Sequence, residues 1–149
     1  MNVLTQFSVF LVNKPGVLAQ VTTAVAKAKI NLVALTLVDS SEHGVLRIVS
    51  DDADVLRTVL AKTHDRFTET EVLAVDLTNE PGAFAVAAEK LAHEHININY
   101  AYCTGGAPGG RTTAIFKVAD LNKALRVLKP AAAKKKSRNP VRRAPGQRR

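Results

Sequence analysis

The spacing of apolar residues changes along the first third of the chain, and each change predicts a new element. Residues 3–12 are rich in β-forming side chains, and Phe7, Val9 and Leu11 alternate as in a half-buried strand. After Pro15-Gly16 apolar side chains recur every three or four residues from position 17 to 28, which indicates an amphipathic helix. Proline at the start of a helix costs no hydrogen bond, so the Pro-Gly turn is a suitable place for the predicted strand to end and the predicted helix to begin.

The next residues predict a hairpin, a second helix and a third extended run. Residues 30–38 and 45–49 are β-prone and flank a polar turn at 40–44. Asp51 or Asp52 can cap a helix that places Leu56, Val59 and Leu60 on its inner face. Residues 67–77 are extended again, so this run is expected to close the first series of elements and open a second one.

The same order of signals occurs twice, 66 residues apart. Asn13-Lys14-Pro15-Gly16 recurs as Asn79-Glu80-Pro81-Gly82, and the Ile-Asn-Leu sequence at 30–32 recurs as Ile-Asn-Ile at 96–98. A unit present only twice is typical of a duplicated domain and not of a solenoid. Each copy has the order β-α-β-β-α-β, which predicts an α+β fold of two ferredoxin-like units, with antiparallel sheets and helices on one face.

Composition and charge mainly change the interpretation of the C-terminal end. The 149 residues are 46% hydrophobic and 23% charged, as in soluble globular proteins. Eight of the 21 basic residues lie between 131 and 149, where there is no acid, so the preceding part is neutral. We expect a first domain at 1–70, a second at 71–129 without an evident fourth strand, and a disordered basic tail at 130–149. The second sheet then has an open edge or needs cover from a partner.

Other function classes find little support in the sequence. A single cysteine excludes an internal disulfide, and no apolar stretch approaches the roughly 18 residues that a membrane span needs. The N-terminal residues do not have the pattern of an export signal, so a cytoplasmic location is expected. The basic tail lacks aromatic residues for base stacking. Residues 134–149 are expected to make at most a weak polyanion contact, to meet an acidic partner or to aid solubility.

No catalytic or metal-binding set emerges from the candidate residues. The loop 105–110 is glycine-rich like a P-loop, but Arg111 takes the lysine position and a strand follows where a P-loop needs a helix. His93 and His95 lack a third ligand, and Cys103 lacks an activating neighbour, so a small apolar filler is its expected role. Capping explains the aspartates at 51, 52 and 54. We expect no enzyme activity and no cofactor.

The two copies resemble ACT domains, which are small ferredoxin-like modules that bind amino acids and regulate enzymes of amino-acid metabolism. The resemblance rests on a β-prone run, the N-x-P-G turn that opens a helix, and the I-N-[LI] sequence that starts the next strand. It spans about residues 3–129 and is similar to stand-alone tandem ACT proteins, which have no catalytic domain. It implies an allosteric, ligand-sensing role and a homodimer.

A helix start is also a physically suitable place for an amino acid. Its unpaired N–H groups and positive dipole end attract a carboxylate, and the oxygens of Asn13 and Asn79 can accept from an ammonium group. Asn31 and Asn97 offer both a donor and an acceptor. The resemblance places the ligand between two ACT units, against the strand-to-helix loop. It implies these contacts: Asn13, Lys14, Pro15, Gly16, Val17 and Leu18 in the first copy, and Asn79, Glu80, Pro81, Gly82, Ala83 and Phe84 in the second.

Structural roles for the same residues stay open at this point. Either asparagine can serve as a turn or cap residue, and Leu18 and Phe84 can belong to the core. Our first hypothesis is a non-catalytic, amino-acid-binding regulatory protein. The alternative is a structural adaptor with vestigial sites, whose basic tail docks on an anionic partner or nucleic acid.

Overall fold

The computed structural model describes residues 1–38, 43–63 and 66–129, and the tail expected at 130–149 lies outside them. The element order confirms the duplicated β-α-β-β-α-β pattern. Along the chain the elements are β1 (Asn2–Val12), α1 (Val17–Lys27), β2 (Leu32–Val38), β3 (His43–Ser50), α2 (Ala53–Lys62), β4 (Arg66–Thr78), α3 (Ala83–His93), β5 (Ile98–Cys103), β6 (Arg111–Val118) and α4 (Leu121–Leu128). In the described ranges no helix is long and apolar enough to cross a membrane.

The strands form one sheet, in which every neighbouring pair is antiparallel. Its order is β2-β3-β1-β4-β6-β5, so the two expected sheets are continuous with each other. The continuity comes from β1 and β4, which have 11 and 13 residues and run through both halves of the molecule. The extended run expected at 67–77 is β4, and the boundary expected between residues 70 and 71 lies inside this strand.

The start of β1 occupies the fourth-strand position of the second half. Asn2, Val3 and Leu4 pair with Ala74, Leu73 and Val72 of β4, and Met1 packs against the core of the second half. The first half therefore has the order β2-β3-β1-β4, and the second has the matching order β5-β6-β4-β1. No strand follows α4 within residues 121–129.

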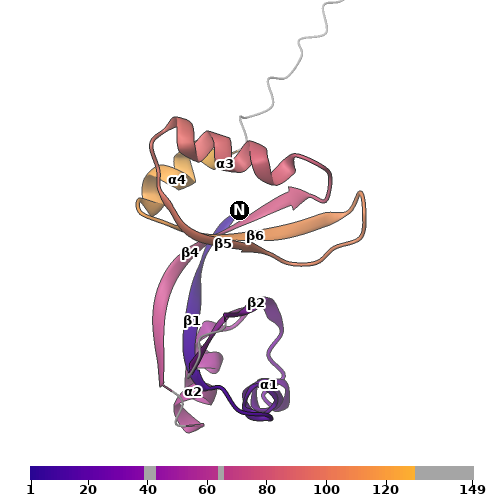
Figure 1. Ribbon diagram of the computed structural model, residues 1–149, viewed down its shortest axis with the longest axis vertical. Coiled ribbons are helices and arrows are strands. Elements are labelled where there is room, and N and C mark those ends of the chain that lie inside the picture. The colour runs from indigo at the N-terminus through magenta and orange to yellow at the C-terminus, as the bar shows by residue number, and fades with distance from the viewer. Residues whose placement is uncertain (39–42, 64–65, 130–149) are drawn as a thin grey trace, which may run out of the picture.

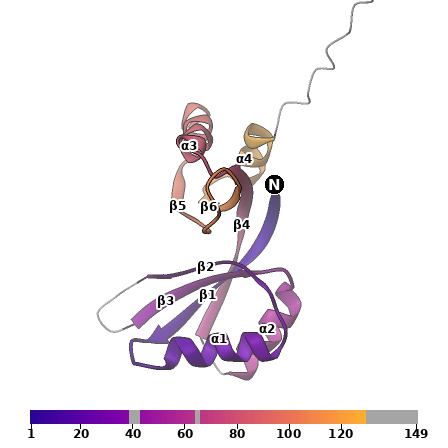
Figure 2. The ribbon, with the colours of Figure 1, turned by 90° about the vertical axis from the view of Figure 1, so that its right-hand side faces the viewer.

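Each half has its own core between a helix pair and the sheet. Val21 and Val25 of α1 and Leu56 and Leu60 of α2 pack on the first half, where Phe7 is fully buried. The second core lies under α3 and α4 and consists of Leu73, Val75, Ala87, Leu91, Ile96, Ala114, Phe116, Val118, Ala124 and Leu128. Figures 1 and 2 show the two helix pairs at opposite ends of the molecule, with the strands between them.

The faces of the two half-sheets that carry no helix are turned toward each other. A third buried cluster joins Ala34 and Val49 of the first half to Val72, Ala74 and Ile115. Gln6 of β1 is fully buried there. Its Nε2 donates to the Tyr100 hydroxyl at 2.6 Å, and its Oε1 accepts from the Tyr102 hydroxyl at 2.8 Å. The Arg47 guanidinium lies 3.9 Å from the centre of the Tyr100 ring. Polar side chains thus link the halves.

The helices begin in two different ways. Asp52 and Asp120 cap α2 and α4, since their Oδ1 atoms accept from the N–H groups of Val55 and Lys123. Of the two aspartates predicted as alternatives for the cap of the second helix, Asp51 and Asp52, the structure thus has Asp52. In contrast, α1 and α3 begin at Gly16 and Gly82 without a side-chain cap. Both glycines have positive φ, 88° and 86°, which disfavours any other residue at these positions.

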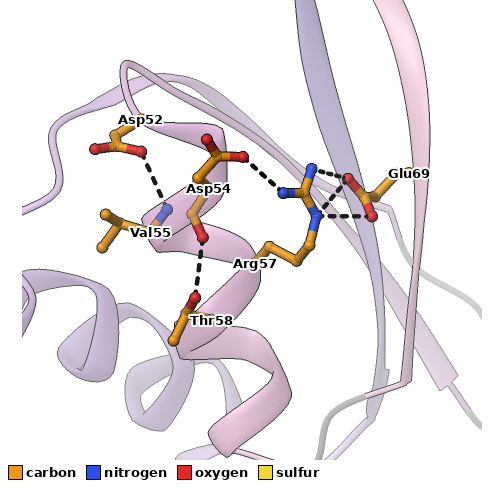
Figure 3. Close-up of polar contacts among 6 residues, drawn as sticks. All are labelled: Asp52, Asp54, Val55, Arg57, Thr58 and Glu69. Atoms are coloured by element: carbon orange, nitrogen blue, oxygen red, sulfur yellow. Dashed lines mark hydrogen bonds and ion pairs between the residues drawn. The ribbon is translucent and has the colours of Figure 1, made fainter.

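A forked ion pair anchors α2 to β4 (Figure 3). The Arg57 Nε donates to Oε1 of Glu69 at 2.9 Å, and Nη1 donates to Asp54 at 2.8 Å. The hydrogen bonds from Arg57 hold the pKa of the Glu69 carboxyl below its usual value near 4.5. The ionised form of Glu69 is therefore favoured in the folded protein.

We expect Glu69→Gln to lower the free energy of unfolding at neutral pH, and we expect this loss to become smaller as the pH falls. The pKa of Glu69 is lower in the folded state than in the unfolded one, so its contribution is complete above the unfolded pKa. It is lost as the pH falls from about 4.5 through the folded pKa. Urea unfolding of both proteins between pH 3 and 7 measures the difference. Glu71→Gln, an exposed position on the same strand, is the control and should give no such trend.

Candidate functional site

A pocket of about 340 Å³ lies beside the first Asn-x-Pro-Gly turn. It is bounded by the end of β1, the start of α1, the end of β2 and the start of β3. The lining residues are Leu11, Val12, Asn13, Lys14, Val17, Leu18, Leu37, Val38 and Gly44. Four residues singled out from the sequence, Asn13, Lys14, Val17 and Leu18, are thus brought together, and Pro15 and Gly16 lie in the turn between them.

The turn presents an open helix start to this pocket. The Lys14 N–H donates to the Val12 carbonyl at 2.9 Å, and the Val17 N–H makes a long 3.4 Å bond to the Lys14 carbonyl. The first turn of α1 contains neither an acidic residue nor a side-chain cap. Its remaining N–H groups and the positive end of the helix dipole are therefore available to an anion.

The polar side chains at the pocket are Asn13 and Lys14. Both are exposed, and Lys14 is the charged one among the described lining residues. Within the described part of the chain, no residue hydrogen bonds with the Asn13 side chain, and the N-cap of α1 is Gly16. Asn13 is thus not a helix cap, and its amide is free to meet a ligand.

In the second Asn-x-Pro-Gly turn, the asparagine is hydrogen-bonded to another loop of the protein. The Asn79 Nδ2 donates to the carbonyls of Gly106 and Ala107 at 2.9 and 3.0 Å. The Asn79 N–H also donates to the Gly110 carbonyl at 2.8 Å, and the Gly109 N–H donates to the Asn79 carbonyl at 3.2 Å. The side-chain amide of Asn79, which corresponds to that of Asn13, is therefore already hydrogen-bonded to the β5–β6 loop.

Phe84 differs in the same way from its first-copy counterpart, Leu18. The Phe84 ring stacks on Phe116, with centroids 5.2 Å apart and planes 17° from parallel. Leu18 and Phe84 are 36% and 39% exposed, so the prediction of core positions for them is wrong. Both follow the turn directly and stay partly open to solvent, Leu18 at the pocket and Phe84 over Phe116 of β6. Glu80, Pro81, Gly82 and Ala83 complete this second turn.

Asn31 and Asn97 do not reach the pocket. They precede β2 and β5, and their carbonyls accept from the N–H groups of Asp51 and Ala119 at 3.2 and 3.0 Å. Asn31 lies at one end of β2 and Val38, a lining residue, at the other. The strand rise puts them roughly 20 Å apart. The repeated Ile-Asn sequence therefore marks a strand start and not a contact with this pocket.

Sequence reasoning missed the lining residues that come from the sheet. Gly44 pairs with Leu11, and a Cβ at Gly44 would lie 3.2 Å from Leu37 Cδ1. The repeat of this glycine as Gly110 was the signal that could have drawn attention to the position. Leu37 and Val38 gave no signal, because aliphatic residues in a β-prone run are typical of any strand.

The remaining candidates show no assembled chemistry. The loop 105–110 joins β5 to β6, which confirms a hairpin connection and excludes a P-loop helix. Cys103 is exposed at the end of β5, not a buried filler, and what burial it has raises the pKa of the thiol. In the described ranges no three His, Cys, Asp or Glu residues gather as a metal site would require.

Comparison with known proteins connects this architecture to a family. The sequence matches the family described as an ACT domain pair over residues 1–134. Protein BT0572 from Bacteroides thetaiotaomicron has a solved structure that is similar with a TM-score of 0.78 and 32% identity. The match covers 85% of this chain and 87% of that one. No curated protein matches the sequence.

More distant structures share the fold. The regulatory subunit of aspartate kinase from Thermus thermophilus, in a ligand-free form, is 15% identical with a TM-score of 0.61, over 85% of this chain and 95% of that one. The corresponding subunit from Thermus flavus is 19% identical with a TM-score of 0.54, over 85% and 90% of the two chains. At these identities the likeness concerns the arrangement of elements.

Proposed function

Because the chain belongs to the family of paired ACT domains, we propose that it is a non-catalytic regulatory protein that binds an amino acid in the pocket at the start of α1. The observation that carries the proposal is the open helix start beside a cavity of about 340 Å³. Cavities of this size suit small molecules. The ligand carboxylate would meet the N–H groups of α1 and the Lys14 ammonium, and the ligand ammonium would meet the Asn13 oxygen.

We propose one ligand per chain, because the two turns are not equivalent. Asn13 is free whereas Asn79 holds the loop 105–110. Lys14 is replaced by Glu80, whose charge would repel a carboxylate. The second turn thus serves the structure of its own half. Regulatory subunits of aspartate kinase share the fold, which is a fold-level analogy for a regulatory role.

The end of β2 lines the pocket, and this edge of the sheet also suits a second copy of the chain. β2 is one of the two outer strands of the sheet, and its Leu35 and Leu37 are 45% and 48% exposed. Unpaired apolar edges are normally covered. A homodimer through β2 would bring a second copy close to the ligand. Binding would then shift the arrangement of the dimer by the difference in ligand affinity between its states.

Titration calorimetry of Lys14→Gln and Glu80→Gln with the twenty amino acids tests the site. The wild type and Glu80→Gln should bind one ligand per chain with equal affinity. Lys14→Gln should bind about five- to tenfold more weakly, because it loses a charge-assisted contact to the carboxylate. Equal affinity of the two variants would contradict the location. Sedimentation equilibrium of the same samples should show a dimer, and a 16.0 kDa species throughout would contradict dimerisation alone.

A further inference from the structure

The walls of the pocket are aliphatic apart from the polar turn. Leu11 and Leu37 line it from the sheet, and Val17 and Leu18 line it from the start of α1. Val12 and Val38 complete the apolar set. Among the described lining residues none is acidic, and none is aromatic. A carboxylate at the helix start therefore leaves the rest of the ligand against hydrocarbon.

The exposure of these side chains indicates that the lining lacks its contact partner. Leu11 is nearly buried, but Leu37, which lies on the same face of the sheet and lines the pocket, is 48% exposed. Gly44, next to Leu11 in the β1–β3 ladder, leaves the space into which Leu37 extends. A ligand with an apolar side chain would remove this surface from water, which is favourable in proportion to the area covered.

The corresponding positions of the second half do not repeat this lining. Leu37 and Val38 become Cys103 and Thr104, and Val17 becomes Ala83. The Thr104 hydroxyl oxygen accepts from the Thr113 N–H at 3.0 Å, so it is committed to the hairpin. The aliphatic wall and the cation are therefore both specific to the first half.

Resting on the proposed function, we propose that the ligand is an amino acid with an uncharged aliphatic side chain, of the leucine, isoleucine, valine or methionine class. Burying a charged or amide side chain here would remove it from water without a hydrogen-bonding partner on the apolar walls. A lysine side chain would in addition meet Lys14, the cation at the pocket. Selectivity then arises from rejection of polar ligands as much as from attraction of apolar ones.

Calorimetric titration of the full chain with leucine, asparagine, aspartate and lysine tests this class. Asparagine is close to leucine in shape but carries an amide, so it isolates polarity from size. We expect leucine to bind at least about tenfold more tightly than asparagine, aspartate or lysine. If no amino acid binds, the proposed function is wrong. If amino acids bind but a polar one binds as tightly as leucine, the aliphatic class is overturned and the proposed function stands.

Two variants of β2 locate the selectivity. Leu37→Thr keeps the β propensity of the edge strand but makes the wall polar, and it should weaken leucine binding about five- to tenfold with less effect on asparagine. Leu35→Thr changes an equally exposed leucine on the same face of β2 that does not line the pocket, so it should leave the ratio of the leucine and asparagine affinities unchanged, because any effect on the contact between copies acts on both ligands alike. The same ratio of affinities in the two variants, both folded by circular dichroism, would overturn the assignment of the wall.

Discussion

Phe116→Ala should lower the free energy of unfolding by about 3–5 kcal/mol, as large-to-small changes at buried phenylalanines do. Phe116 is fully buried in the second core and supports the Phe84 ring that covers the second turn. The change leaves a cavity between the sheet and α3 and removes the stacking partner. Since small domains are stable by only about 5–15 kcal/mol, this is a large fraction of the total.

Urea unfolding followed by circular dichroism measures this loss. Phe10→Ala is the control, because Phe10 is 44% exposed and its loss should cost far less. Phe116→Leu, which fills part of the cavity, gives a smaller loss should the alanine variant fail to fold. A loss for Phe116→Ala no greater than that for Phe10→Ala would show that the second core does not depend on this ring.

Gln6→Leu should cost about 1–3 kcal/mol, although it replaces a buried polar residue with an apolar one. The Gln6 amide is the hydrogen-bonding partner of two tyrosine hydroxyls from β5. Leucine would leave both hydroxyls without this partner at the contact between the halves. Burial raises the pKa of the Tyr102 phenol above its usual value, so this hydroxyl keeps the proton that it donates.

A double-mutant cycle separates the hydrogen bonds from general packing. Gln6→Leu is combined with Tyr100→Phe and Tyr102→Phe, and each protein is unfolded in urea. In the background without hydroxyls the glutamine keeps only a long hydrogen bond to Ser8 Oγ at 3.4 Å, so its replacement should cost little or even stabilise. The same loss in both backgrounds would show that the amide does not link the halves through these hydrogen bonds.

The contact at Gln6 also connects the half that contains the pocket with the other half. The pocket belongs to the first half, and the tyrosines belong to β5 of the second. Beside this contact, the buried Arg47 Nε has no hydrogen-bond partner in the described part of the chain, although the guanidinium lies over the Tyr100 ring.

The local sequence determined the elements and their order. Proline and glycine fix the Asn-x-Pro-Gly turns, and the positive φ of Gly16 and Gly82 explains why each turn contains this glycine. Asp52 and Asp120 cap helices by contacts within their own first turns. Such features depend on neighbours in the chain, so they could be predicted. The 66-residue repeat then predicted the duplicated fold.

The candidate site could be predicted only in part. Asn13, Lys14, Val17 and Leu18 lie in one turn and were accessible from the sequence, whereas Leu37 and Gly44 join them only through strand pairing. The repeat also predicted two Asn-x-Pro-Gly turns, and their sequences already differ, with Lys14 in one and Glu80 in the other. The structural difference between them depends on the Asn79 contacts with Gly106 and Ala107, which are 27 and 28 residues away.

What only the tertiary structure decided is how the two copies share a sheet. Alternation in residues 3–12 predicted that Phe7, Val9 and Leu11 share a buried face, and all three lie in the first core, while Gln6 lies on the other face of β1. The sequence could not show that the second half covers that face. Nor could it show that the first residues of β1 complete the second half. Periodicity reports which side chains share a face, but the partner of a face is set by strand pairings between residues distant in the chain.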